Sequence, residues 1–112
     1  MDMKSSAFSR LGQDFRGTTI LGNGIDQEVL RRAGIERADA FVAATQGDNR
    51  NIMASQIAKH VFGVKRVVTR VYDPLRSDTF AALGLQAISP TIIGANSFYE
   101  ELTGESAPKL PV

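Results

Sequence analysis

Apolar residues occur along this chain in two patterns. Short, mostly apolar runs lie at residues 18–21, 40–44, 67–72 and 85–89, and each is followed by glycine, proline or a polar turn. Runs of this length with such ends predict β-strands. The run at 40–44 is apolar throughout rather than alternating, which is typical of a strand covered on both faces.

Between these runs, apolar residues recur every three or four positions, which predicts helices. Phe8, Leu11 and Phe15 predict an amphipathic helix with Ser5 and Ser6 as candidate caps, ended by Gly17. The aspartates and glycines that flank the later stretches can cap and terminate helices. Further helices are therefore predicted from Asp26 to Gly34, from Asp48 to Phe62, from Asp73-Pro74 to Leu83, and through Ile92 and Leu102 to Gly104.

The alternation of strands and helices predicts the fold class. About four β–α units indicate an α/β domain with a mostly parallel sheet of about four strands in a three-layer α/β/α arrangement. The chain has 112 residues, which fits one domain and is too short for two. We expect the domain to span residues 1–104 and the segment at 105–112, which contains two prolines, to be a loose tail.

Composition and charge exclude several classes of function. The chain has no cysteine, which excludes disulfide scaffolds, thiol nucleophiles and cysteine-bound zinc and fits a cytoplasmic protein. Lys plus Arg number 13 and Asp plus Glu 12, so a net charge of +1 argues against nucleic-acid binding. The longest apolar stretch, at 40–44, is far shorter than the ~20 residues that cross a bilayer, so no direct membrane insertion is expected.

The residues of common catalytic chemistry are also missing. His60 is the only histidine and lies beside Lys59, where a solvated role is expected. No serine occupies a G-x-S-x-G turn, and no spacing of His, Asp and Glu is typical of a metal site. We therefore expect no catalytic residues, no metal site and a protein that is not an enzyme.

Parallel α/β sheets bind ligands beyond the carboxyl ends of their strands, where three turns of this chain fall. These are Gly22-Asn23-Gly24, residues 45–49 and residues 70–73. Asn23 can also be a simple turn residue, and we expect Thr45 and Asp48 to cap the next helix, with binding as an additional role. Arg70 lies in an apolar strand, so it needs either an anionic ligand or an internal partner among Asp39, Asp48 and Asp73.

The order of these segments resembles the TrkA-N family, whose members are also called RCK or KTN domains. The resemblance runs from about Ala7 to Pro90. It rests on Gly22-Asn23-Gly24, on Leu-Arg-Arg-Ala-Gly-Ile at 30–35, on Ala-Asp-Ala at 38–40, on Ala43-Ala44-Thr45 with Asp48 and Asn51, and on Val-Thr-Arg-Val at 68–71 with Asp73-Pro74.

The resemblance implies a Rossmann-like cytoplasmic domain that regulates a membrane potassium channel or transporter. Such a domain stays peripheral to the membrane through that partner subunit and self-associates as a dimer or a larger ring. The implied ligands are NAD(H) or the adenine nucleotides ATP, ADP and AMP.

The resemblance also implies which residues bind the nucleotide. Gly22, Asn23 and Gly24 correspond to the stretch beside the adenine, although the family usually has aspartate where this chain has Asn23. Thr45 corresponds to a residue near the phosphates, Asp48 and Asn51 to the start of the following helix, and Arg70 to an arginine that faces the same crevice.

One part of the family pattern is missing. No strand with a G-x-G-x-x-G turn, and no second strand ending in an acidic residue, precedes Ala7, so the resemblance implies an N-terminally truncated domain without the pyrophosphate grip. The missing strands would lie between residues 18–21 and 40–44 of the sheet. A second polypeptide, an exchange between two chains, or direct pairing of 18–21 with 40–44 can fill this gap, and direct pairing is the simplest.

Two functions therefore compete. In the first, nucleotide binding near Thr45 and Arg70 favours one arrangement of subunits and so regulates potassium uptake. In the alternative, the chain is a structural or oligomerisation fragment that binds no nucleotide. Phe98, Tyr99 and Leu102 on the last helix either complete the core or form a dimer contact. A nicotinamide dehydrogenase ranks third, because it needs the missing glycine turn and a proton-transfer group.

Overall fold

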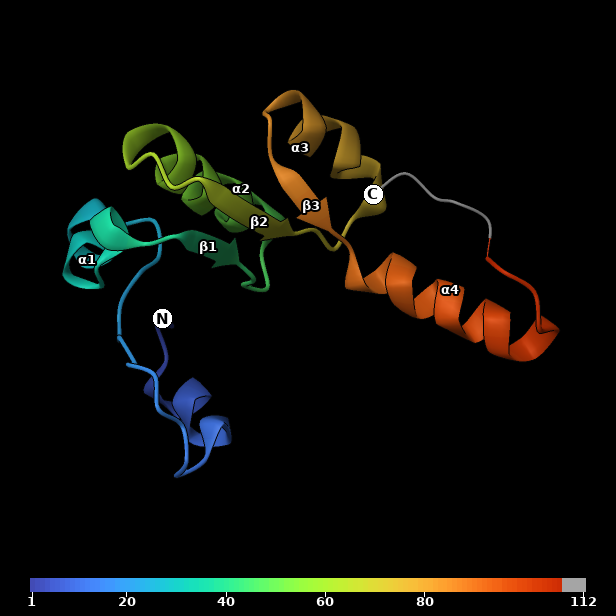
Figure 1. Ribbon diagram of the computed structural model, residues 1–112, viewed down its shortest axis with the longest axis horizontal. Helices are drawn as coiled ribbons and strands as arrows, with labels where there is room; N and C mark the ends of the chain where they lie inside the picture. Colours follow the sequence, from blue (N-terminus) through green and yellow to red (C-terminus); the bar gives the residue numbers. More distant parts are fainter. Residues whose placement is uncertain (108–112) are drawn as a thin grey trace.

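The computed structural model describes residues 1–107 (Figure 1). The predicted loose tail at 105–112 therefore falls mostly outside the described residues.

The centre of the fold is a parallel sheet in the order β1-β2-β3. Its strands are β1 (Ala40–Ala43), β2 (Arg66–Arg70) and β3 (Gln86–Ile88). Val42 lies opposite Val68, and Arg70 lies opposite Ile88. Each connection between these strands contains a helix, as parallel pairing requires. The prediction of a parallel α/β sheet is confirmed.

Helices precede, connect and follow the strands. A 3-10 helix (Ser5–Leu11) and α1 (Gln27–Arg32) come first, and α1 leads into a 3-10 turn at Ile35–Arg37. The β1–β2 connection holds α2 (Asp48–Gln56) and a π-helical turn (Ile57–Val61). The β2–β3 connection holds a 3-10 turn (Pro74–Arg76) and α3 (Ser77–Ala82). The last element, α4 (Pro90–Thr103), extends away from the sheet (Figure 1).

The helix ends follow from local chemistry. Asp26 Oδ1 accepts the backbone N–H of Glu28 at 2.9 Å and caps α1, as predicted. Ser89 caps α4 and Pro90 opens it, while Gly104 ends it in the left-handed conformation at φ 71°.

One apolar core lies beside one face of the sheet. Val67 and Thr69 point to this face from β2, and Val71 continues their alternation beyond the strand. Inside, the Thr69 hydroxyl donates to Ser55 Oγ on α2 at 2.7 Å, so the buried hydroxyls satisfy each other. The buried apolar residues of this core are Leu30, Ile35, Ala58, Val64, Val67, Val71, Phe80 and Leu85.

The opposite face of the sheet is incompletely covered. Val42 on β1 is 64% exposed and Ile88 on β3 is 41% exposed. The unbroken apolar run at 40–44 predicts that other elements cover both faces of the sheet. Within residues 1–107, only one face is fully covered. Apolar side chains on a sheet face normally pack against another layer.

The predicted strand at 18–21 is not part of the sheet, which has three strands within the described residues instead of about four. Leu21 forms only an isolated parallel bridge with Asp2. Asp2 N–H donates to the Ile20 carbonyl at 3.1 Å, and Gly22 N–H donates to the Asp2 carbonyl at 2.9 Å. The hypothesis that 18–21 pairs directly with 40–44 is therefore wrong, because Asp2 takes this pairing position.

The predicted first helix also differs from the observed one. It is the 3-10 helix Ser5–Leu11, which has no side-chain cap and ends at Gly12, with φ 77°, rather than at Gly17. Leu11 and Phe15 remain 44% and 45% exposed. A short amphipathic segment depends on packing for most of its helical stability, and no residue of Ser5–Leu11 is buried.

Candidate functional site

The predicted ligand-binding turns meet at the carboxyl end of the sheet. Thr45 follows β1, Arg70 ends β2, and Asp48 and Asn51 lie in the first turns of α2. The short β1–α2 connection brings these four residues together, because parallel strands end at the same edge.

Asn51 joins the ends of two strands. It is fully buried, and its Oδ1 accepts the backbone N–H of Thr45 at 2.9 Å and the Thr45 hydroxyl at 2.6 Å. Its Nδ2 donates to the carbonyls of Thr45 at 3.1 Å and Arg70 at 3.0 Å. These bonds use both donors and both acceptor positions of the amide, so Asn51 holds the frame of the site and leaves no polar group for a ligand.

Asp48 holds the loop after β2. Its Oδ1 accepts the N–H of Tyr72 at 2.7 Å, and its Oδ2 accepts the N–H of Asp73 at 3.0 Å. The expectation that Thr45 and Asp48 cap α2 is wrong: the N-cap is Gly47, which makes no side-chain cap bond. Asp48 is the first residue of the helix, and its two carboxylate oxygens accept hydrogen bonds from two N–H groups of a neighbouring loop.

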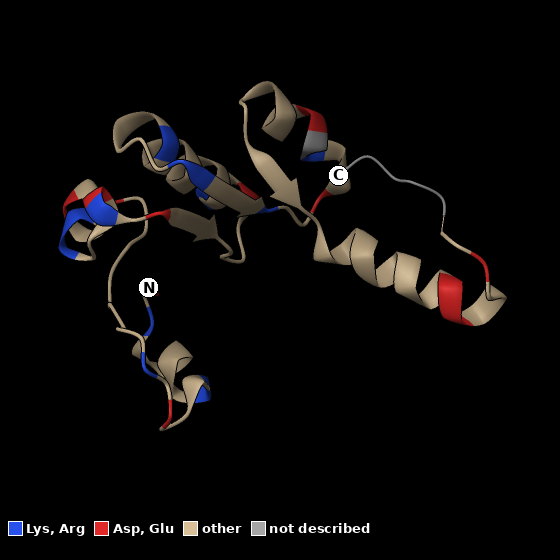
Figure 2. Ribbon diagram, viewed as in Figure 1, with Lys and Arg blue, Asp and Glu red and all other residues tan. Residues whose placement is uncertain are grey.

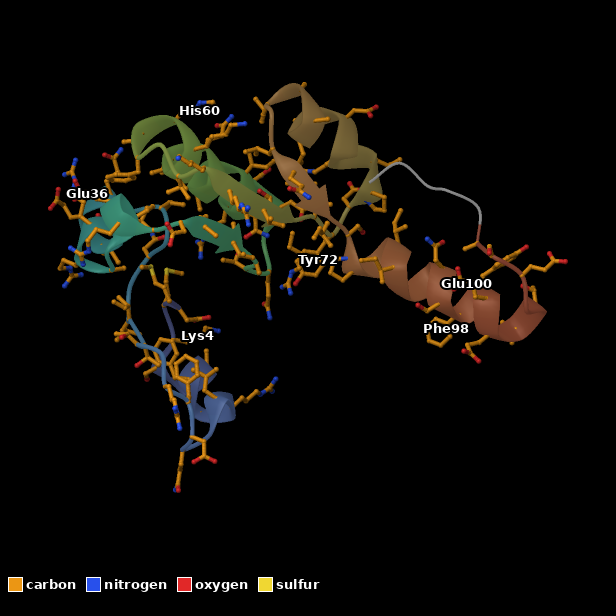
Figure 3. All side chains as sticks on the ribbon, in the orientation of Figure 1. Lys4, Glu36, His60, Tyr72, Phe98 and Glu100 are labelled. Atoms are coloured by element: carbon orange, nitrogen blue, oxygen red, sulfur yellow. The ribbon has the colours of Figure 1, made fainter. Side chains whose placement is uncertain are left out.

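Arg70 has neutral partners. Its Nη2 donates to the Thr45 carbonyl at 3.1 Å and contacts the Tyr72 hydroxyl. The guanidinium carbon lies 4.6 Å from the centroid of the Tyr72 ring, and Figure 3 shows Tyr72 beyond the carboxyl end of β2. Arg70 Nε is buried without a hydrogen-bond partner.

Of the two alternatives for Arg70, the internal ion pair with Asp39, Asp48 or Asp73 is therefore not formed. Among residues 1–107 the ion pair formed is that of Arg31 with Glu28. Both carboxylate oxygens of Asp48 instead accept the backbone N–H groups of Tyr72 and Asp73. Arg70 thus carries a positive charge that no carboxylate of the described residues neutralises, together with an unused N–H donor.

The side chain of Asn23 stabilises the turn Gly22-Asn23-Gly24. Asn23 Oδ1 accepts the N–H of Ile25 at 3.1 Å, so the interpretation of Asn23 as a turn residue is confirmed. Gly22 packs against α1: a Cβ at this position would lie 2.5 Å from Val29 Cγ1. Any other residue at this position would have to displace the Val29 side chain.

A cavity of about 640 Å³ lies beside this cluster. Four of the predicted binding residues line it, namely Gly22, Gly24, Thr45 and Arg70. Asn23, Asp48 and Asn51 are not among its lining residues. The rest of the wall comes from Met1, Asp2, Met3, Lys4, Ala7, Leu30, Phe41, Val42, Ala43, Ala44, Gln46, Arg50 and Ala54. A second cavity of about 540 Å³ shares Thr45, Gln46 and Arg50 with it.

Sequence reasoning missed the contribution of the first four residues. Asp2 lies at the cavity and pairs with the chain just before the glycine turn. Its signal in the sequence is weak, because an acidic residue between two methionines is too short a pattern to predict a strand end.

Charged residues of both signs are distributed over several elements (Figure 2). Within residues 1–107, no His, Asp and Glu side chains are grouped to bind a metal ion. No helix of that part of the chain combines the length and apolar character needed to cross a membrane.

A family model and similar known proteins point to the same family. The model of the TrkA-N domain family matches residues 1–90, so the match begins before the expected start at Ala7. The Trk system potassium uptake protein TrkA of Streptomyces coelicolor is 39% identical over 110 residues, which cover 98% of this chain and 49% of that protein. A TrkA homolog of Pyrococcus abyssi is 31% identical over 91% of this chain and 48% of its own length. The chain thus spans about half the length of these relatives.

Two solved structures are similar to the fold. The crystal structure of the GsuK RCK domain matches with a TM-score of 0.72 and 25% identity, covering 83% of this chain and 21% of that chain. The NAD(P)-binding domain of an exopolyphosphatase-related protein from Archaeoglobus fulgidus matches with a TM-score of 0.71 over 93% of this chain and 77% of its own. At 16% identity, the second match supports the fold alone.

Proposed function

Since the chain belongs to the TrkA-N domain family and has its Rossmann-like fold, we propose that it is a nucleotide-responsive regulatory module of a potassium channel or transporter. The relatives named above are parts of Trk potassium uptake systems, and the solved structure is an RCK domain of GsuK. The module would act in the cytoplasm, bound to a membrane subunit, and perform no chemical reaction.

Arg70 is the observation that carries the nucleotide part of the proposal. Arg70 has neutral partners, its buried Nε has no hydrogen-bond partner, and it lies on the wall of a cavity of about 640 Å³. These properties suit an anionic ligand. A phosphate offers several acceptor oxygens and the missing negative charge, and arginine binds it with geometrically defined hydrogen bonds. Gly22, Gly24 and Thr45 line the same cavity and can approach the rest of the nucleotide.

Asp2 favours one class of nucleotide. In dinucleotide-binding sheets, an acidic residue hydrogen-bonds a ribose hydroxyl and repels a phosphate at the 2′ position. Asp2 lines the cavity and lies next to the glycine turn, and one of its carboxylate oxygens accepts the N–H of Lys4 at 2.9 Å. Its other oxygen can accept from a ribose hydroxyl. We therefore expect NADH to bind better than NADPH, with ATP, ADP and AMP as the competing ligands.

The helix α4 supplies a surface for self-association. Phe98 is 73% exposed and Leu102 is 85% exposed, and side chains four residues apart share one face of a helix. No residue of α4 is buried, and Figure 3 shows Phe98 on the part of α4 that projects from the rest of the fold. A dimer that covers this face would let a bound nucleotide favour one arrangement of two modules.

Calorimetric titration with NADH, NADPH, ATP, ADP and AMP tests this function. The expected result is saturable binding of at least one nucleotide, with NADH tighter than NADPH. If none binds at millimolar concentration, this chain is not a nucleotide sensor.

The second candidate function is structural. Asn51 and Asp48, two of the residues implied to bind nucleotide, are engaged in bonds within the protein. This observation favours an oligomerisation unit that keeps the frame of the site without a ligand. Such a unit would form a folded oligomer in analytical ultracentrifugation and show no shift in Tm with any of the five nucleotides.

A further inference from the structure

Asn23 differs in its surroundings from the other asparagines of the chain. The chain has four asparagines, and Asn23 is the one that precedes a glycine. It lies in the turn before α1, outside the helices and strands, and it is partly exposed. At Gly24 a Cβ would meet no atom within 4 Å beyond its chain neighbours. No other part of the protein therefore crowds the backbone at this position.

The hydrogen bonds of the turn fold the Asn23 side chain back along the backbone. Asn23 Oδ1 accepts the N–H of Ile25 at 3.1 Å, and the Asn23 carbonyl accepts the N–H of Asp26 at 3.0 Å. The first of these bonds makes an Asx turn. The backbone nitrogen of Gly24 therefore belongs to the hydrogen-bonded ring that begins at Asn23 Oδ1 and ends at the Ile25 N–H.

This arrangement favours a reaction between the Gly24 nitrogen and the Asn23 side chain. Within residues 1–107, neither Nδ2 of Asn23 nor the N–H of Gly24 has a hydrogen-bond partner. Attack of that nitrogen on Cγ of Asn23 places a negative charge on Oδ1, to which the Ile25 N–H already donates. A donor fixed at a developing oxyanion stabilises the transition state. A nucleophile held next to its target within the same molecule gains a further advantage.

We propose that Asn23 is a site of spontaneous deamidation, in which the chain modifies itself with water as the co-reactant. The Gly24 nitrogen loses its proton to solvent and forms a bond to Cγ of Asn23. The bond from Cγ to Nδ2 then breaks, and Nδ2 takes a proton from solvent and leaves as ammonia. The product is a five-membered succinimide ring, and no atom is oxidised or reduced.

Water opens this ring in one of two ways. Attack at Cγ breaks the bond from Cγ to the Gly24 nitrogen and leaves an aspartate in an ordinary main chain. Attack at the main-chain carbonyl carbon of residue 23 breaks the original peptide bond, and the chain then continues through Cγ as an isoaspartate. Either product carries a new carboxylate, which changes the formal net charge from +1 to zero at pH 7.

The two products have different effects on the turn. An aspartate still has an Oδ1 that accepts the Ile25 N–H, so the turn is kept. An isoaspartate adds a methylene group to the main chain between two fixed points. These points are Gly22, which packs against Val29, and Asp26, which caps α1. Because the longer backbone must displace one of these contacts, deamidation changes the conformation of the turn as well as its charge.

Two other asparagines are internal controls. Asn51 uses its whole side-chain amide in bonds to Thr45 and Arg70. Asn96 lies inside α4, where the hydrogen-bond ladder of the helix holds the next backbone N–H away from the side chain. We expect neither of them to form a succinimide in the folded chain.

Mass spectrometry of the full chain during incubation tests the proposal. After ageing at neutral and at mildly alkaline pH, the proteolytic peptide that contains residue 23 should gain about 1 Da, the difference between an amide and an acid. Peptides that contain Asn51 or Asn96 should stay unchanged. The rate should rise with pH, because the attacking nitrogen must lose its proton. A methyltransferase specific for isoaspartate should label part of the product.

The contribution of the fold is measured against a synthetic peptide of residues 18–30. Because the turn places the reacting groups and the Ile25 donor, the folded chain should deamidate at least as fast as this peptide. Gly24→Ala adds a Cβ that the open space accepts but that hinders the attack, so the reaction should slow at least several-fold. Gly94→Ala, also in open space but on α4, should leave the rate unchanged.

Other results would overturn the proposal. A folded chain that reacts more slowly than the peptide would show that the turn protects Asn23. Equal rates at Asn23, Asn51 and Asn96 would mean that the reaction occurs in the unfolded chain. Unchanged kinetics in G24A would exclude attack by the nitrogen of residue 24, and a constant mass at residue 23 would exclude the reaction. None of these results depends on whether a nucleotide binds.

Discussion

At the scale of single residues, the site separates into a frame and a binding surface. The polar atoms of Asn51 bond to the backbone of Thr45 and Arg70, and those of Asp48 bond to the backbone at 72 and 73. Arg70 keeps an unused donor and a charge without a carboxylate partner. The frame fixes where the guanidinium lies, and in the proposed function this guanidinium binds the anionic group of the ligand.

The frame can be tested through stability. Asn51→Ala should lower the free energy of unfolding by about 2–4 kcal/mol, because it removes a fully buried side chain and leaves part-buried backbone groups of Thr45 and Arg70 without partners. The measurement is urea denaturation. Asn49→Ala in the same helix is the control: Asn49 is exposed and its side chain makes one exposed bond, accepted from Arg76 Nη1, so its loss should change stability by less than about 1 kcal/mol. Equal effects of the two substitutions would contradict the role assigned to Asn51.

Local sequence patterns predicted the residues with local partners and failed for those with distant partners. Asp26, Gly34 and Gly104 act within their own turns, and each was predictable. Asp48 was expected to act locally as a cap, but its partners are the N–H groups at 72 and 73, which are distant in the sequence. Arg70 was expected to need either an anionic ligand or an internal acid, and its partners within the protein are instead neutral groups, the Thr45 carbonyl and the ring and hydroxyl of Tyr72.

At the scale of elements, packing decided which predicted segments became regular structure. The helices around β2 bury residues in the core and were predicted in the correct order, although Ile57–Val61 forms a π-helical turn and Pro74–Arg76 a 3-10 turn. The segments at 5–15 and 18–21 have helix-like and strand-like patterns, but they contribute no residue to the core within the described part of the chain. In the structure, Ser5–Leu11 is a 3-10 helix and Leu21 forms a single bridge with Asp2.

The start of α1 is fixed by one cap. Asp26→Ala removes the acceptor for the N–H groups of Glu28 and Val29 and should cost about 1 kcal/mol of stability. Thermal denaturation measures this as a lower Tm. Asp26→Asn keeps the acceptor oxygen and should retain most of the stability. A loss as large in D26N as in D26A would show that the carboxylate charge, not the cap bond, stabilises this helix end.

The apolar face of α4 predicts self-association. The double substitution Phe98→Ser with Leu102→Ser should shift the assembly toward monomers without lowering the stability of the monomer, since both side chains are exposed. Sedimentation velocity over a range of concentrations measures the effect. Ser97→Ala on the same helix should leave assembly unchanged. An unmodified chain that is monomeric at every concentration would contradict the prediction.

At the scale of the whole molecule, the fold is a half-open sheet. One face carries the core, the other exposes Val42 and Ile88, and the outer edge of β1 faces a cavity. The parallel order of β1, β2 and β3 was predictable, because each strand is followed by a helix. The pairing of Asp2 with 20–22 was not predictable, because it joins a very short segment to a distant one by two bonds.

The same open architecture explains why ligand and partner are both expected. A parallel sheet binds ligands at the carboxyl ends of its strands, and this end holds Thr45, Arg70 and the glycine turn. An open face and an exposed α4 are surfaces that further polypeptide can cover. A nucleotide that binds between such surfaces can favour one arrangement of them over another.

The measurement that tests the central claim most directly is calorimetric titration of NADH into three proteins: the unmodified chain, Arg70→Gln and Arg66→Gln. Arg66 begins the same strand at the opposite end of the sheet and is exposed. R70Q should weaken binding about tenfold or more through loss of the charge-assisted contact to phosphate, while R66Q should bind like the unmodified chain. Equal affinities of R70Q and the unmodified chain would contradict the assignment of Arg70 as the anion-binding residue.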